Sequence, residues 1–75
     1  FNPTTKINFE LSKSTNVKLT VFNSIGQVVM NIFEGFKPAG SYQAEFNGSS
    51  LSSGTYYYRL DTDFFTETKK MQLIK

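Results

Sequence analysis

The 75-residue sequence predicts an all-β fold, an antiparallel sandwich of six or seven short strands. Apolar and polar residues alternate along most of the chain, which is the period of half-buried strands and not of helices. Clusters of Asn, Gly, Pro and Ser interrupt this pattern about every 8–12 residues, the spacing typical of sandwiches. No segment longer than one turn has a helical period, and no repeat of fixed length indicates a solenoid. We therefore expect one domain that spans residues 1–75.

Strict alternation predicts the first two strands. Apolar side chains occupy every second position of residues 7–11, which indicates a half-buried strand. The same spacing over residues 17–21 predicts a second strand, ending at Phe22. The polar run of residues 12–16 between them is expected to be a turn.

Two tight turns flank the third strand. Residues 23–26 have Asn in the first position and Gly in the fourth, which predicts a type I turn completed by a left-handed glycine. Residues 28–33 are apolar except for one asparagine, and two adjacent valines favour an extended conformation there. Proline in the second position of residues 37–40 predicts another turn, after which residues 42–46 alternate as a fourth strand.

Two further strands are predicted in the last third of the chain. Polar residues 47–50 end the fourth strand, and Leu51 is expected to enter the core beneath this loop. Residues 52–54 lead to a fifth strand, in which Tyr56, Tyr58 and Leu60 share one face. Residues 61–64 are expected to be a turn, and residues 65–74 a long final strand.

The composition excludes the commonest catalytic groups. The chain has no Cys and no His, so disulfides, thiolate metal sites and histidine-dependent triads are absent. Eight basic and six acidic residues give a net charge of +2, which is too even for a nucleic-acid surface. No apolar run approaches the about 20 residues of a membrane span. We therefore expect no catalytic residue, no cofactor, no metal, no nucleic-acid partner and no membrane span.

Three acidic residues near the end, Asp61, Asp63 and Glu67, form the densest acidic group. A calcium loop needs more oxygen ligands and usually a glycine at its bend. Paired glycosidase carboxylates need a cleft around them. We therefore interpret the two aspartates as turn formers on a solvated hairpin.

The triplet of tyrosines at residues 56–58 divides between two faces of a strand. Alternation places Tyr56 and Tyr58 toward the core, with their hydroxyls at its rim, and Tyr57 on the opposite face beside Arg59. Tyr57 is either ordinary surface packing or a platform for a sugar ring. Surface packing is favoured, because a single exposed aromatic residue is common on such a sheet.

Residues 66–75 mix lysines with apolar residues. One interpretation is an edge strand on which Lys69 and Lys70 prevent intermolecular pairing. The other is a C-terminal address, a strand edge with a basic tip that a receptor recognises. The residues alone favour neither interpretation.

Four blocks of the sequence form an ordered pattern. They are residues 1–7 (Phe-Asn-Pro-Thr-Thr-Lys-Ile), 21–28 (Val-Phe-Asn-Ser-Ile-Gly-Gln-Val), 51–60 (Leu-Ser-Ser-Gly-Thr-Tyr-Tyr-Tyr-Arg-Leu) and 68–75 (Thr-Lys-Lys-Met-Gln-Leu-Ile-Lys). In this order, and over the whole chain, they resemble the motifs of the C-terminal sorting domains of the bacterial type IX secretion system.

The resemblance implies an immunoglobulin-like antiparallel β-sandwich of about seven strands, carried at the C-terminus of exported enzymes and adhesins of the Bacteroidetes and related phyla. Such domains are not catalytic. They direct a parent protein from the periplasm through an outer-membrane translocon and its shuttle proteins to the cell surface or exterior. A sortase-type protease then removes many of them. The sequence also resembles the immunoglobulin-like domain of flagellar hook-capping proteins, which is an assembly part.

Carried onto this sequence, the resemblance implies a sorting signal made of Gly54, Tyr56, Lys69, Lys70, Met71, Leu73, Ile74 and Lys75. We expect Gly54 to allow a tight turn that a side chain would hinder. We expect the final strand to offer unpaired backbone groups for strand addition, and its lysines to contact an acidic receptor groove. The chain begins without Met or a leader, so we expect it to be the C-terminal domain of a longer parent protein.

Two other functions stay open. One is a carbohydrate-binding module of a secreted glycoside hydrolase, although such modules usually expose several aromatic residues, often Trp, and this chain has no Trp. The other is a structural cap or spacer that stabilises a catalytic neighbour.

Overall fold

The computed structural model describes residues 3–74, which form β-strands joined by turns and loops and contain no helix. The strands are β1 (Thr4–Leu11), β2 (Thr15–Asn23), β3 (Val28–Lys37), β4 (Gly40–Asn47), β5 (Gly54–Thr62) and β6 (Thr66–Leu73). The predicted all-β class is confirmed. Residues 3–74 form six strands, which agrees with the six or seven predicted from the pattern and is one fewer than the resemblance implies.

The loop between β4 and β5 folds on itself and adds no strand. The backbone N–H of Leu51 donates to the carbonyl of Gly48 at 2.9 Å. The N–H of Ser49 donates to the side-chain oxygen of Asn47, also at 2.9 Å. Such local hydrogen bonds compete with a sheet ladder for the same backbone groups. Leu51 is half-buried and packs against the core, as predicted.

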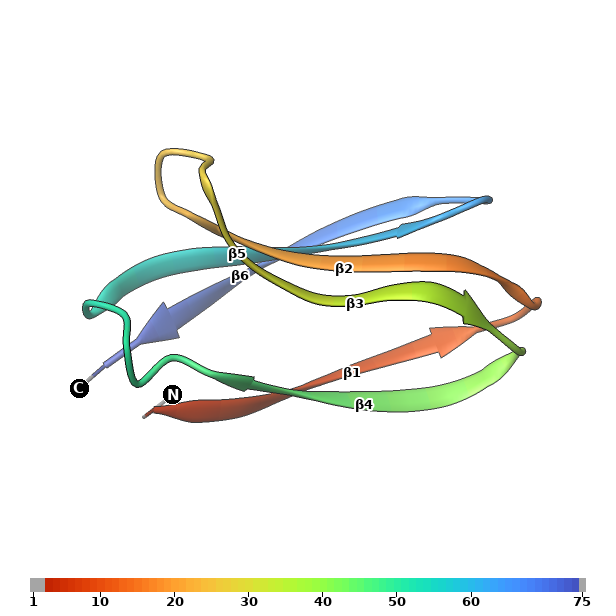
Figure 1. Ribbon diagram of the computed structural model, residues 1–75, viewed down its shortest axis with the longest axis horizontal. Coiled ribbons are helices and arrows are strands. Elements are labelled where there is room, and N and C mark those ends of the chain that lie inside the picture. The colour runs from red at the N-terminus through yellow and green to blue at the C-terminus, as the bar shows by residue number, and fades with distance from the viewer. Residues whose placement is uncertain (1–2, 75) are drawn as a thin grey trace.

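The strands form two antiparallel sheets that pack as a sandwich (Figure 1). The small sheet has the order β1-β4, and the large sheet has the order β3-β2-β5-β6. The chain passes from β1 to β2 and from β3 to β4 by short connections between the sheets, the second made only of Pro38 and Ala39. Two strands therefore face four.

The core lies between the two sheets, where side chains from alternate strand positions meet. Phe46, Leu19 and Val21 have no exposed surface. The buried apolar residues come from five of the six strands: Ile7, Leu11, Val17, Leu19, Val21, Phe46, Tyr56, Leu60 and Leu73.

The third strand is longer than predicted. It reaches Lys37, past the expected end at residue 33. Its pairing with β2 shifts register twice, and the shifts leave Val29 and Ile32 without a direct partner. Both residues still pack against the core. Bulges of this kind add a residue to one strand and so break the period of two, which explains the continuous apolar run.

The turn between β2 and β3 has the predicted type. Gly26 has a φ of +88°, a left-handed conformation that glycine adopts without steric cost. The side-chain oxygen of Asn23 accepts hydrogen bonds from the backbone N–H groups of Ile25 (3.2 Å) and Gln27 (2.9 Å). Its amide nitrogen donates to the Gln27 side chain at 2.9 Å. The Asn-x-x-Gly-Gln block is therefore a turn-forming motif.

The fifth strand also extends past its predicted end. Asp61 lies within β5, where it is paired with Thr66 and accepts a hydrogen bond from the Thr66 hydroxyl at 3.0 Å. The interpretation of Asp61 as a turn former is therefore wrong. The turn begins after Thr62, whose hydroxyl oxygen accepts hydrogen bonds from the backbone N–H groups of Phe64 and Phe65.

Candidate functional site

The last strand, β6, is an edge of the large sheet. It pairs with β5 along one side, and no strand formed by residues 3–74 pairs with its other side. The expected edge position is therefore confirmed. Lys69 lies opposite Tyr58 and Lys70 opposite Tyr57. Because directly opposed residues share a face of the sheet, the two lysines point to opposite faces.

The register of β6 brings the two parts of the expected sorting signal together. Gly54 lies opposite Leu73, and Tyr56 lies opposite Met71. The block at residues 51–60 and the terminal block are therefore adjacent strands of one surface. Lys75 lies outside the described residues.

Three residues of the signal hold β6 on the sandwich. Leu73 is 1% exposed, and a Cβ added at Gly48 would lie 3.1 Å from its Cδ2 atom. Tyr56 is buried, as predicted, and its hydroxyl donates to the carbonyl of Ser52 at 2.8 Å. Met71 is half-buried against the core. These side chains stabilise the strand, and the buried Tyr56 and Leu73 are not accessible to a partner.

Gly54 is favoured by its backbone conformation and not by crowding. Its φ is +155°, which residues with a side chain rarely adopt. A Cβ built at this position would meet no atom within 4 Å. The expectation that a side chain would hinder this entry into β5 is therefore confirmed, and the hindrance comes from the backbone conformation and not from a steric contact.

The remaining described residues of the signal are exposed. The Lys69 ammonium lies 3.6 Å from the carboxylate of Glu67, on the core-facing side of β6, and its side chain is 57% exposed. Lys70 is exposed on the outer face of the sheet. Ile74 is 65% exposed. Exposed ion pairs contribute little to stability, so these side chains are available for contacts with another molecule.

A cluster on the outer face of the large sheet was not predicted from the sequence. The guanidinium of Arg59 lies 4.8 Å from the centre of the Phe22 ring, and its Nε donates to Asp61 at 2.8 Å. A depression of about 280 Å³ beside them is bordered by Tyr57 and Thr68. Phe22 and Arg59 meet because β2 pairs with β5, and no local sequence signal indicates this pairing.

The acidic residues singled out from the sequence have separate partners. Asp61 binds the arginine just described, and Glu67 binds Lys69. A carboxylate oxygen of Asp63 accepts hydrogen bonds from the backbone and side-chain N–H groups of Asn16, at 3.3 and 3.2 Å. Within residues 3–74, no three or more His, Cys, Asp or Glu side chains gather in a way that would hold a metal ion.

The fold and the site together define a class of protein. The chain is an antiparallel β-sandwich whose last strand is an accessible, lysine-bearing edge fixed to the core by buried residues. An exposed sheet edge of this kind is suited to recognition by another polypeptide.

The chain belongs to a family described as the secretion system C-terminal sorting domain, whose family model matches residues 2–75. This match confirms the resemblance to sorting domains of type IX secretion. Domains of this family are non-catalytic C-terminal sorting signals, so membership implies export by that route. Neither a curated protein nor a solved structure matches the chain significantly. The described part of the chain includes no helix long and apolar enough to cross a membrane.

Proposed function

We propose that this chain directs a longer parent protein, to which it is covalently joined, through the type IX secretion system to the cell surface or exterior. The proposal is supported by one observation above all: the terminal block that carries the family signature forms a free edge strand with both lysines exposed. The partners we expect are the outer-membrane translocon, its shuttle proteins and a sortase-type protease.

Recognition in this proposal is divided between backbone and side chains. The unpaired edge of β6 supplies main-chain hydrogen bonds to an added strand, which gives affinity. Lys69 and Lys70 attract acidic groups on the partner and set the register. These lysines point to opposite faces of the sheet. A partner that contacts both lysines must therefore reach around the edge of β6. Leu73, which is buried, positions the strand without touching the partner.

Charge removal at the edge tests this proposal. A reporter carrying this domain is compared with a Lys69→Gln/Lys70→Gln variant and with a Lys6→Gln/Lys18→Gln control of equal net charge. We expect the secreted fraction to fall only in the first variant, because Lys6 and Lys18 lie on β1 and β2, neither of which pairs with β6. Urea unfolding of each isolated domain verifies that both variants fold. Equal secretion of all three reporters would contradict the proposed recognition of β6.

Carbohydrate binding is a second candidate function, favoured by the depression beside Tyr57. An aromatic ring bordered by Asn23, Ser24 and Thr68 offers a stacking face next to hydrogen-bonding groups. Titration of the ¹⁵N-labelled domain with soluble polysaccharides tests this function. Saturable shifts at Tyr57 would support it, and unchanged spectra would exclude it for the sugars tested.

A further inference from the structure

A groove of about 540 Å³ separates β1 from β6. Phe9, Tyr42, Leu60 and Phe65 supply its apolar surface, and the Glu67–Lys69 ion pair lies at its polar rim. Phe65 is 40% exposed, and Phe9 is only partly covered. The groove therefore presents apolar surface that the chain itself does not fill.

The topology places a free strand edge along this groove. The two-residue connection between β3 and β4 keeps β4 close to β3, at the side of the large sheet farthest from β6. Since β1 pairs with β4 along one edge, its other edge is turned toward β6. No strand within residues 3–74 pairs with that edge.

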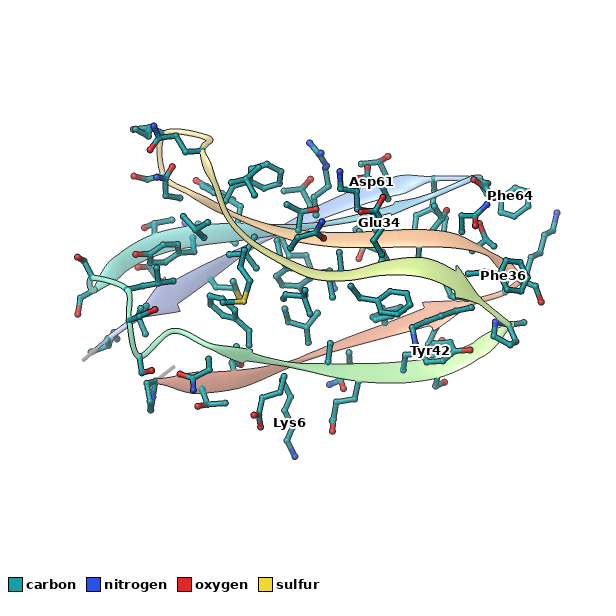
Figure 2. All side chains as sticks on the ribbon, in the orientation of Figure 1. Lys6, Glu34, Phe36, Tyr42, Asp61 and Phe64 are labelled. Carbon is teal, nitrogen blue, oxygen red and sulfur yellow. The ribbon has the colours of Figure 1, made fainter. Side chains whose placement is uncertain are left out.

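The exposed side chains of β1 add a charge pattern. Residues 6–10 read basic, apolar, polar, apolar, acidic. Lys6 and Glu10 are exposed on the outer side of the small sheet, and neither forms an ion pair with any described residue. Figure 2 shows Lys6 projecting away from the sandwich. Cross-strand pairs of opposite charge stabilise antiparallel strands, and like charges destabilise them.

We propose that this groove binds a single extended peptide segment, which pairs antiparallel with β1 as a third strand of the small sheet. The segment carries an acidic residue opposite Lys6, a basic residue opposite Glu10, and apolar residues opposite Ile7 and Phe9. Its apolar side chains enter the groove against Leu60. This binding site uses the edge of β1 and not the edge of β6, although Lys69 borders the groove, and the proposal does not depend on the proposed function.

The position of β6 selects a lone segment over a folded copy of this domain. A strand added to β1 lies beneath β6 of the same domain. If that strand were the β1 of a second folded domain, the second domain's β5 and β6 would have to occupy the same space as the first domain's β5 and β6. A single strand brings no second sheet, so only an extended segment fits.

The β1 sequence supplies a suitable probe, because residues 6–10 are self-complementary when two copies run antiparallel about Asn8. We propose titrating the ¹⁵N-labelled domain with a synthetic peptide of residues 3–12 (Pro-Thr-Thr-Lys-Ile-Asn-Phe-Glu-Leu-Ser), to about 1 mM. Saturable shifts at β1, Leu60 and Phe65, with slower hydrogen exchange along β1, are expected. Unchanged spectra, or shifts confined to the free edges of β3 or β6, would overturn the proposal.

Charge reversal tests the register. A peptide with Lys6→Glu places a carboxylate opposite Glu10 of the domain, so we expect binding about fivefold weaker than with the original peptide. A domain variant with Glu10→Lys restores the opposite charges, and it is expected to bind the reversed peptide with the original affinity. Failure of this rescue would overturn the register and the proposed charge pattern of the segment.

Discussion

Two neighbouring aliphatic side chains at the end of β6 have opposite environments. Leu73 is 1% exposed and lies against the glycine at position 48, whereas Ile74 is 65% exposed. Both belong to the terminal signature, yet only Leu73 has packing to lose. The signature therefore combines a residue that stabilises the fold with residues that are free to contact a partner.

Alanine substitution separates these two roles. Leu73→Ala leaves a cavity in the core, so we expect it to lower the free energy of unfolding by about 2–4 kcal/mol. Ile74→Ala removes only exposed surface, and its effect is expected to stay within about 0.5 kcal/mol. Urea unfolding followed by circular dichroism measures both values. Similar losses in the two variants would show that the end of β6 does not pack as described.

The edge strand β6 carries its own protection against unwanted pairing. Its free side has unpaired backbone groups, which are a template for another β-strand. Lys69 and Lys70 place a charge on each face of the strand near its middle. A natural edge often uses lysine in this way, because burying an ammonium between two pairing strands is unfavourable.

Removing this protection has a measurable consequence. We expect a Lys69→Val/Lys70→Val variant to self-associate at concentrations where the original domain is monomeric, because the edge becomes flat and apolar. Light scattering over a concentration series detects the difference. The Lys18→Val variant on β2, a strand paired on both sides, is the control and should stay monomeric. If the control associated to the same extent, the self-association would result from added apolar surface in general and not from loss of the protected edge.

Alternation was sufficient to predict four of the strands, and it failed where bulges interrupt it. β1, β2, β4 and β5 follow the period of two, while the two register shifts in β3 hide its true length. The exposed lysines of β6 were also identified from the sequence. The outer cluster of Phe22 and Arg59 was not, because it depends on which strands become neighbours, and this depends on packing of the whole chain.

The sandwich as a whole is asymmetric, because two strands cover four. Residues on the core-facing side of β6 show the result: Glu67 and Lys69 are exposed, whereas Leu73 is buried. The pairings that hold this arrangement join distant parts of the chain, such as Thr4 with Asn47 and Val17 with Thr62. Such non-local pairings require loops to close before contacts form.

This topology predicts slow folding for so short a chain. All-β domains dominated by distant pairings fold in about milliseconds to seconds, whereas local helical folds take microseconds to milliseconds. We therefore expect a refolding time in the slower range after dilution from urea. Stopped-flow tyrosine fluorescence measures it, since the chain has four Tyr and no Trp. Complete refolding within microseconds would contradict the non-local topology.

The burial of Leu73 also bears on the order of events during synthesis. This residue fills a space beside the start of β1 and the loop after β4, because Gly48 contacts it and bonds the carbonyl of Pro3. The sandwich is therefore complete only once Leu73 has been synthesised and has packed beside Gly48. A chain that stopped before this residue would lack a core side chain as well as the end of the exposed edge strand.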